Sequence, residues 1–303
     1  MRRRWIAALA LGGATALVLS GCGNPAGVDG DLTNNWAAMA DPKPFVPPAE
    51  VCHSADFAEV AYLSSFNPVD CASPHRLETV FVGELTGSAA SGKAPPAKGS
   101  PEIRAAFAEC DTKTKEYVGA DWRTARLRLG VVLPSPQAWE GGSRWFRCDI
   151  TEVTNIEDNG DTTTRTGSVK GVLASASPLS LGCYQVKLAK DSSIDTMPSA
   201  ACTKDHNSEF VGVYLAPDGP YPSKSADWDK LHGECRKVIA KYASVPNDGN
   251  LKYRTGVVSL PGNEDEWTGG NRGVRCYLWL SERKVNRSLK GVGPNGLPIQ
   301  YED

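Results

Sequence analysis

The chain has 303 residues, of which 41% are hydrophobic and 22% charged, and its formal net charge is -2. At roughly 150 residues per domain this length predicts about two domains, and the apolar content excludes wholesale disorder. The near-neutral charge argues against a nucleic-acid partner, because nucleic-acid-binding proteins present a clustered basic surface. The cysteines number nine. Because nine is odd, at least one cysteine has a different role from the rest.

Residues 1–21 have the pattern of a lipoprotein signal peptide. Three arginines, Arg2 to Arg4, precede an apolar stretch from Trp5 to Leu19. About 15 apolar residues are too few for a membrane-spanning helix, which needs roughly 20. The stretch ends in Leu-Ser-Gly followed by Cys22, which resembles the bacterial lipobox, whose cysteine is lipidated and becomes the first residue after cleavage. We therefore predict an exported protein held at the outer face of the plasma membrane by a lipid on Cys22. The alternative is an uncleaved anchor helix that ends in a chance cysteine.

Residues 22–50 are predicted to be a tether. The segment has few apolar residues and ends in a run that contains Pro42, Pro44, Pro47 and Pro48. Proline fixes φ and lacks a backbone donor, so the segment is semi-extended and spans at most roughly 90 Å. Loss of the three arginines upstream changes the formal net charge from -2 to -5. The exported body is therefore no better suited to an anionic partner such as nucleic acid.

The remaining cysteines reveal an internal duplication. They are Cys52, Cys71, Cys110, Cys148, Cys183, Cys202, Cys235 and Cys276. The first four are separated by 19, 39 and 38 positions, and the last four by 19, 33 and 41. Matching intervals indicate two copies of one unit. We assign copy one to residues 51–177 and copy two to residues 178–303.

Residues around the cysteines agree between the copies. The matching motifs are Cys71-x3-His75-x2-Glu78 with Cys202-x3-His206-x2-Glu209, Gly130-Val131-Val132 with Gly256-Val257-Val258, and Trp139-x-Gly-Gly-x-Arg144 before Cys148 with Trp267-x-Gly-Gly-x-Arg272 before Cys276. So many matches in the same order exclude coincidence, and they place equivalent chemistry in both halves of the chain.

Each copy is predicted to be a small antiparallel sheet with one covering helix, which makes the fold α+β. Runs rich in β-branched and aromatic residues predict the strands, and a proline in the first turn with apolar residues on one face predicts the helix. The expected strands are 79–82, 127–133 and 145–153 in copy one and 210–214, 252–260 and 273–280 in copy two; the expected helices are 101–118 and 226–243. Residues 154–166, an acidic and Thr-rich insertion in copy one, are expected to form an exposed loop.

An even set of cysteines in an exported protein predicts a disulfide framework. Identical pairing within each copy leaves three patterns. Among them we favour Cys52–Cys71, Cys110–Cys148, Cys183–Cys202 and Cys235–Cys276. The alternative is a metal site, because Cys71 lies near His75 and Cys202 near His206. Structural zinc sites, however, usually place paired cysteines two to four residues apart, so we expect no metal and no other cofactor.

The repeated histidine and glutamate are the first candidate ligand-binding residues: His75, Glu78, His206 and Glu209. A histidine beside a carboxylate can act as a general base. No nucleophile recurs beside them, however, so we expect the protein to have no enzymatic activity. In the structural interpretation the histidine closes the turn beside the disulfide, and the glutamate pairs with Arg144 or Arg272. Two histidines that do not recur, His53 and His232, are expected at the surface.

The repeated tryptophan and arginine are the second set of candidates: Trp139, Arg144, Trp267 and Arg272. An indole beside a guanidinium can form a platform for a sugar or a peptide carboxylate. The structural interpretation is a tight turn that carries a core tryptophan and a buried ion pair.

The repeated unit resembles the septum formation domain of actinobacterial envelope proteins. The resemblance rests on the Cys-x3-His-x2-Glu turn, the cysteine-bearing helix and the Trp-x-Gly-Gly-x-Arg loop, which recur over nearly all of residues 51–303. It implies a membrane-tethered envelope protein linked to cell division, and it implies no particular reaction. We therefore expect a non-enzymatic binding or scaffold module with a cell-division or cell-wall partner. The alternatives are a glycan-binding module that uses the tryptophans and a peptidoglycan-acting enzyme that uses the repeated His/Glu pair.

Overall fold

The computed structural model describes residues 27, 29–31, 43–156, 160–191 and 193–300. The predicted signal peptide and Cys22 lie outside these residues. Residues 44–303 form one compact unit that contains both copies. Among the described residues, none of the helices has both the length and the apolar character needed to cross a membrane.

Copy one is built on a six-stranded sheet, sheet 1, with the strand order β2-β5-β6-β4-β1-β3. Its strands are β1 (Val51–His53), β2 (Val60–Ala61), β3 (Pro68–Val69), β4 (Leu77–Glu84), β5 (Leu127–Pro134) and β6 (Trp145–Glu152). Its helices are α1 (Ser88–Ser91), α2 (Pro101–Val118) and α3 (Pro136–Glu140), with 3-10 turns at Leu63–Ser65 and Trp122–Thr124. The strands are antiparallel except β2, which pairs in parallel with the end of β5. This parallel pair is a departure from the expected antiparallel sheet.

Copy two is built on a five-stranded sheet, sheet 2, with the strand order β10-β7-β11-β13-β12. Its strands are β7 (Cys183–Tyr184), β10 (Ser199–Ala200), β11 (Ser208–Leu215), β12 (Gly256–Pro261) and β13 (Gly273–Trp279); β8 (Lys187–Leu188) and β9 (Ile194–Thr196) form a separate hairpin. Its helices are α4 (Ser225–Ala243), α5 (Glu264–Thr268) and α6 (Gly293–Gly296), with a 3-10 turn at Leu251–Tyr253.

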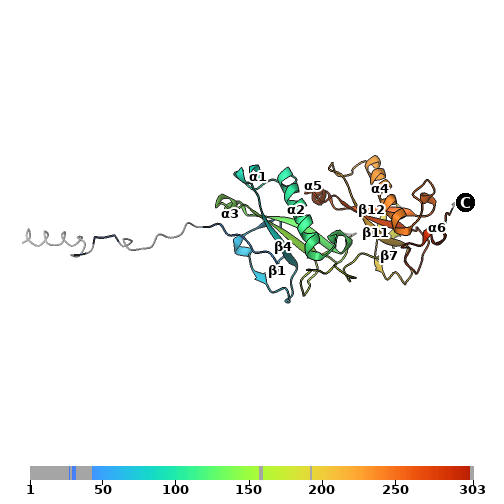
Figure 1. Ribbon diagram of the computed structural model, residues 1–303, viewed down its shortest axis with the longest axis horizontal. Helices are drawn as coiled ribbons and strands as arrows, with labels where there is room; N and C mark the ends of the chain where they lie inside the picture. Colours follow the sequence, from blue (N-terminus) through green and yellow to red (C-terminus); the bar gives the residue numbers. More distant parts are fainter. Residues whose placement is uncertain (1–26, 28, 32–42, 157–159, 192, 301–303) are drawn as a thin grey trace, which may run out of the picture. The chain divides into compact units, whose positions relative to one another are not determined.

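The two sheets have the same topology. The order β5-β6-β4-β1-β3 in sheet 1 corresponds strand for strand to β12-β13-β11-β7-β10 in sheet 2. The long strands β4 and β11 carry an irregularity at the same place, after Thr79 and after Phe210. Figure 1 shows one long helix over each sheet, α2 in copy one and α4 in copy two. The predicted α+β fold of two homologous disulfide-linked units is confirmed.

Disulfides join each long helix to the sheet beneath it. Cys110 of α2 bonds Cys148 of β6, and Cys235 of α4 bonds Cys276 of β13. The other two pairs, Cys52–Cys71 and Cys183–Cys202, join the first strand of each copy, β1 or β7, to the turn that precedes its long strand, β4 or β11. The favoured pairing is confirmed.

Local signals determine both ends of helix α2. The Ser100 side chain accepts from the N–H of Ile103, and Gly119 ends α2 at a φ of 92°, a conformation that glycine adopts without strain.

Two local expectations were wrong. The strand expected from residue 252 begins at Gly256, because Leu251 is drawn into the core by a 3-10 turn. The insertion 154–166 is not simply an exposed loop. Among its described residues, Thr162 pairs with Val153, Arg165 pairs with His75, and Ile156 packs on the core of copy two. Apolar contacts and backbone pairing thus bind both ends of the insertion to the fold.

Buried arginines connect the two copies. The guanidinium of Arg123 donates to Asp111 Oδ1 in copy one at 2.6 Å and to Asn271 Oδ1 in copy two at 2.9 Å. The Nε atom of Arg275 donates to the carbonyl of Arg123 at 2.9 Å. Both arginines are buried. Because a buried charge needs its partners to remain in place, this network holds the copies in one arrangement.

Candidate functional site

The repeated glutamates are buried hydrogen-bond acceptors. Glu78 accepts from the hydroxyls of Tyr117 and Ser168 and, at 2.8 Å, from the N–H of Val169. In copy two Glu209 accepts from equivalent groups. These donors are Tyr242 Oη at 2.8 Å, Ser288 Oγ at 3.1 Å and the N–H of Leu289 at 2.7 Å. Each glutamate is 1% exposed. The carboxylate therefore ties the long strand to the helix and to the C-terminal segment of its own copy.

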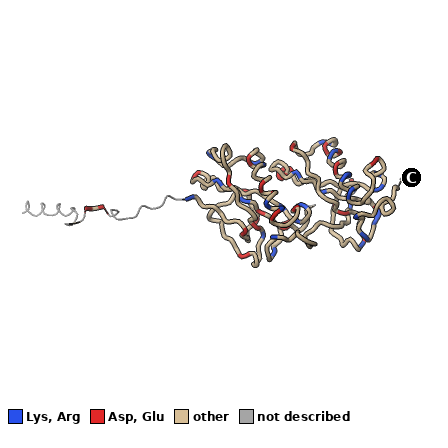
Figure 2. The backbone as a smooth tube through the Cα atoms, viewed as in Figure 1, with Lys and Arg blue, Asp and Glu red and all other residues tan. Residues whose placement is uncertain are grey.

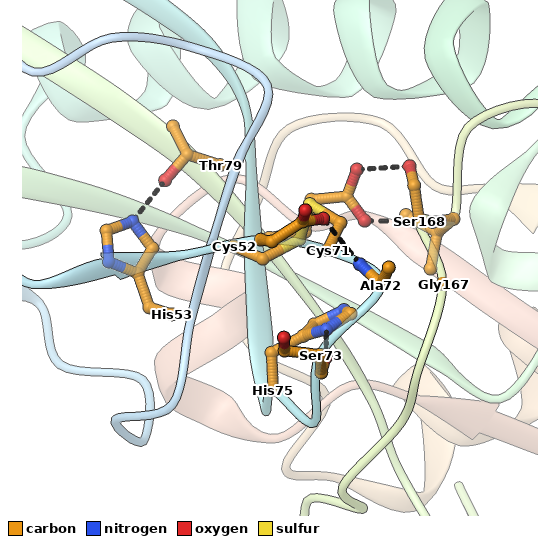
Figure 3. Close-up of a disulfide and its surroundings, with 12 residues drawn as sticks. Cys52, His53, Cys71, Ala72, Ser73, His75, Thr79, Gly167 and Ser168 are labelled. Atoms are coloured by element: carbon orange, nitrogen blue, oxygen red, sulfur yellow. Dashed lines mark hydrogen bonds between the residues drawn. A yellow bond between two sulfur atoms is a disulfide. The ribbon is translucent and has the colours of Figure 1, made fainter.

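The repeated histidines close the turn beside a disulfide. His75 Nδ1 donates to the carbonyl of Ser73 at 2.8 Å, as Figure 3 shows, and His206 Nδ1 donates to the carbonyl of Lys204 at 2.8 Å. In copy two, His206 Nε2 also lies 3.0 Å from Glu209 Oε1. This contact requires a proton on one of the two groups, either an imidazolium facing a carboxylate or a neutral imidazole facing a carboxylic acid. Both rings are buried, whereas a general base must reach its substrate.

The expected pairing of these glutamates with arginine is wrong. Arg144 stacks over the Trp139 ring, with its guanidinium carbon 4.0 Å from the ring centroid, and it donates to the carbonyls of Ala90 and Trp139. In copy two the carboxylate partner of Arg272 is Asp218. The glutamates already receive hydroxyl and amide donors, so a guanidinium is not needed to satisfy them.

The Trp-x-Gly-Gly-x-Arg motif fastens the loop that follows the long strand. The indole N–H of Trp139 donates to the carbonyl of Gly92 at 2.8 Å, and that of Trp267 donates to the carbonyl of Gly219 at 3.0 Å. The two indoles are 1% and 4% exposed. The core-tryptophan interpretation therefore holds, and neither ring offers a face to a sugar. Among the described residues Arg144 has no carboxylate partner, so the buried ion pair expected beside the tryptophan is not formed there; its guanidinium bonds backbone carbonyls instead.

Possible metal-ligand atoms do converge in each copy, sulfur and oxygen in copy one and sulfur, nitrogen and oxygen in copy two. Cys52 and Cys71 lie near Glu78, and Cys183 lies near His206 and Glu209. Each of these sulfur atoms is already in a disulfide. A zinc site needs thiolate sulfur, so these clusters lack the ligands that the metal hypothesis supposed.

A buried polar cluster on sheet 1 has no counterpart in sheet 2. Thr79 lies opposite Asp149 across the β4–β6 pair. At the equivalent position of copy two, Phe210 lies opposite Tyr277 across the β11–β13 pair. In copy two the aromatic rings pack edge to face, with Tyr184 against Tyr277 at a centroid separation of 5.4 Å. Copy one thus carries polar and titratable groups where copy two has an aromatic core.

Hydrogen bonds connect the members of this cluster. Asp149 accepts from Thr79 Oγ1 at 2.8 Å and from Arg147 Nη2 at 2.7 Å, and His53 Nε2 lies 3.3 Å from Thr79 Oγ1. Burial raises the pKa of Asp149 to about 6, even though Arg147 and Thr79 favour its charged form. Burial, and then the charge of Arg147, lowers the pKa of His53 to about 4. His53 is 4% exposed, so its expected place at the surface was wrong. His232 is half-buried.

Asp149 lies on the wall of a cleft of about 740 Å³. Residues 128–131 of β5, together with Leu133, line it along the edge of sheet 1. The remaining walls come from the segment 56–60, from α2, and from residues 263–269 of copy two. Perturbed titratable groups in a cleft mark a candidate functional site. None of the eight candidate ligand-binding residues lines this cleft, although Gly130, Val131 and Gly269 of the repeated motifs do.

The profile of a family described as "Septum formation" matches residues 49–276, which take in most of both copies. This chain is a member of the septum formation family. Neither the curated proteins nor the solved structures contain a match to it. The family resemblance seen in the repeated motifs is thereby confirmed, and it links this septum formation protein to cell division.

The polar cluster of this septum formation protein makes its stability depend on pH in two opposing ways. In the unfolded chain His53 takes up a proton near its ordinary pKa of 6.5, whereas in the folded protein it does so near pH 4. The unfolded state binds more protons between these values, so stability is lost as the pH falls through them. Asp149 has the opposite effect between about pH 6 and its ordinary value of 3.8, because the folded state then binds more protons.

Replacing His53 with glutamine should remove only the first of these effects. Between pH 7 and pH 4.5, His53→Gln is expected to lose about 1–2 kcal/mol less stability than the wild type. Urea unfolding at both pH values, followed by tryptophan fluorescence, measures the difference. His232→Gln is the comparison: burial lowers the pKa of His232 as well, but this histidine is only half-buried, so its replacement should remove a smaller part of the loss. Equal losses in wild type and His53→Gln would contradict the assignment.

Proposed function

We propose that this septum formation protein is a non-enzymatic binding module of the cell envelope. In this proposal it is exported, it is anchored to the outer face of the plasma membrane by a lipid on Cys22, and it binds a partner in cell division or in the cell wall. Membership of the family carries the proposal. The lipobox at Leu19 to Cys22 and the Pro-rich tether support the location.

The arrangement of the candidate residues supports binding over catalysis. The repeated His/Glu pairs are buried and act within the turn and the sheet. The two tryptophans of the repeated motif are buried under their arginines. The enzymatic and glycan-binding alternatives would each need these groups exposed. The cleft along β5 provides a binding surface instead.

In-cell crosslinking tests the proposal directly. A crosslinker applied to intact cells should join the full chain to an envelope protein of the division or wall machinery, and a fluorescent fusion should concentrate at the septum. Cys22→Ala should release the protein from the membrane fraction and abolish both results. Uniform distribution together with the absence of any crosslinked product would contradict the proposal.

The mass of the purified full chain tests the anchor and the disulfides together. We expect a form that begins at Cys22 and carries the lipid, with its eight other cysteines resistant to alkylation until a reductant is added. After reduction all eight should react. A mass that retains residues 1–21, or an alkylated cysteine before reduction, would contradict the assignment.

A further inference from the structure

The edge of sheet 1 within the cleft has unpaired backbone groups. In an antiparallel strand, alternate residues direct both their N–H and their C=O to the same side. Leu133 donates its N–H away from β6 to the carbonyl of Glu59, and Leu127 presents its carbonyl outward to Arg275. Leu129 and Val131 lie between them with the same orientation. Their outward backbone groups have no hydrogen-bond partner among the residues that the structure describes.

These unpaired backbone groups belong to a largely buried part of the strand. Leu129 is only 7% exposed, and buried backbone groups are nearly always paired in folded proteins. The cleft runs along this part of β5. The short strand β2 covers the edge only at Leu133 and Pro134. Between Leu127 and Leu133, whose outward groups are paired, the stretch from Arg128 to Val132 spans roughly 13 Å, which is enough for an added strand of about three or four residues.

The polarity of the cleft lining differs between the two faces of sheet 1. On the side of α2 it is apolar, where Leu129 and Val131 pack with Phe107. On the other side lies Asp149, opposite Gly130 in the β5–β6 pair. The side chains of an added strand would alternate between these two environments.

The charge of the cleft indicates which side chains fit. Five acidic residues with exposed or half-buried side chains line it: Asp56, Glu59, Asp161, Asp265 and Glu266. A sixth, Asp149, is buried and is neutralised by its ion pair with Arg147. Three lining residues are basic: Arg76, Lys98 and Arg128. The carboxylate of Asp161 makes no ion pair with any described residue, whereas Lys98 is shared between Glu59 and Asp265. The excess of carboxylates favours a cationic ligand.

We infer that the cleft binds an extended segment of a partner protein, which adds a strand to the edge of β5 at Leu129 and Val131. Apolar side chains of that segment point toward α2, and alternate lysine or arginine side chains point toward Asp161 and the other exposed carboxylates of the cleft. Main-chain hydrogen bonds supply affinity in such strand addition, and the alternating side chains supply specificity. The inference rests on the proposed function and names the chemistry of its partner.

Fluorescence polarisation on the full chain provides the test. The probe is a labelled hexapeptide that alternates valine and lysine, and the control peptide alternates valine and glutamate. We expect the lysine peptide to bind at least tenfold more tightly. Backbone N-methylation of either all the valines or all the lysines separates strand addition from simple charge attraction. One of the two methylated peptides should lose at least tenfold in affinity, and the other should stay within about threefold. Equal effects of both methylations, or no binding at about 1 mM peptide, would overturn the inference.

Variants of the protein test the same contacts. Val131→Pro removes an outward N–H without breaking the β5–β6 pairing, as proline can at a strand edge, and should weaken lysine-peptide binding at least tenfold. Val257→Pro is the control on the edge strand β12 of copy two and should leave binding unchanged, and Asp161→Asn should weaken it about threefold to tenfold. If Val131→Pro misfolds, the N-methylated peptides on the wild type still decide the question. If Val131→Pro folds and gives the same crosslinked partner in cells, the proposed function stands and strand addition is wrong.

Discussion

Replacing Glu209 with alanine is expected to lower the free energy of unfolding by about 3–5 kcal/mol, the cost of breaking a buried charged network. The carboxylate accepts hydrogen bonds from Tyr242, Ser288 and the N–H of Leu289, and it contacts His206. The alanine would leave the buried N–H of Leu289 and the buried ring of His206 without this partner, and it would remove the link to Tyr242 and Ser288. Urea unfolding followed by tryptophan fluorescence measures the loss.

The control for this experiment is Glu282→Ala, because Glu282 is an exposed residue of the same copy. Its change should stay within about 0.5 kcal/mol. Glu78→Ala should behave like Glu209→Ala, since it has the equivalent donors in copy one. A Glu209→Ala protein as stable as Glu282→Ala would show that the network does not hold copy two together.

Removal of the disulfide between α4 and β13 is the second large effect. The double substitution Cys235→Ala and Cys276→Ala should cost about 4 kcal/mol, and Cys183→Ala with Cys202→Ala should cost about 3 kcal/mol. The order follows from loop length, because the first pair closes 41 positions and the second closes 19. A longer closed loop restricts the unfolded chain more strongly.

Urea midpoints of the two double variants, each compared with the wild type under oxidising conditions, measure these losses. The Cys235/Cys276 variant also leaves two small cavities beside Trp267 and Val274 in the core of copy two, which adds to its cost. If both double variants unfolded within about 1 kcal/mol of the wild type, the disulfides would be dispensable for stability.

The duplicated fold could be predicted because its signals are local or chemical. Cysteine spacing indicated two copies and the correct pairing. Pro101, Gly119 and the buried face of α2 set a helix with the predicted bounds. These features depend on backbone preference and on the geometry of a covalent bond, which neighbouring residues scarcely change.

The register of the outer strands could not be predicted in this way. The sequence match places Val131 with Val257, but Val131 lies opposite Cys148 and Ser259 lies opposite Cys276. Val131 is therefore equivalent to Ser259, two residues further along. Strand register is set by the packing of whole faces and by the lengths of the connecting turns, so a short shared motif does not determine it.

By itself the sequence determined that this protein is two copies of a disulfide-linked unit with the features of the septum formation family. Only the tertiary structure showed that the repeated His/Glu and Trp/Arg residues are buried, and that the cleft lies elsewhere. The cleft draws on the segment 56–60, on β5 and on residues 263–269, which are far apart in the chain. The residues that distinguish it, such as Asp149, do not recur in copy two. Comparison of the copies identifies what the fold requires of both, whereas a binding surface in one copy depends on which side chains the packing brings together.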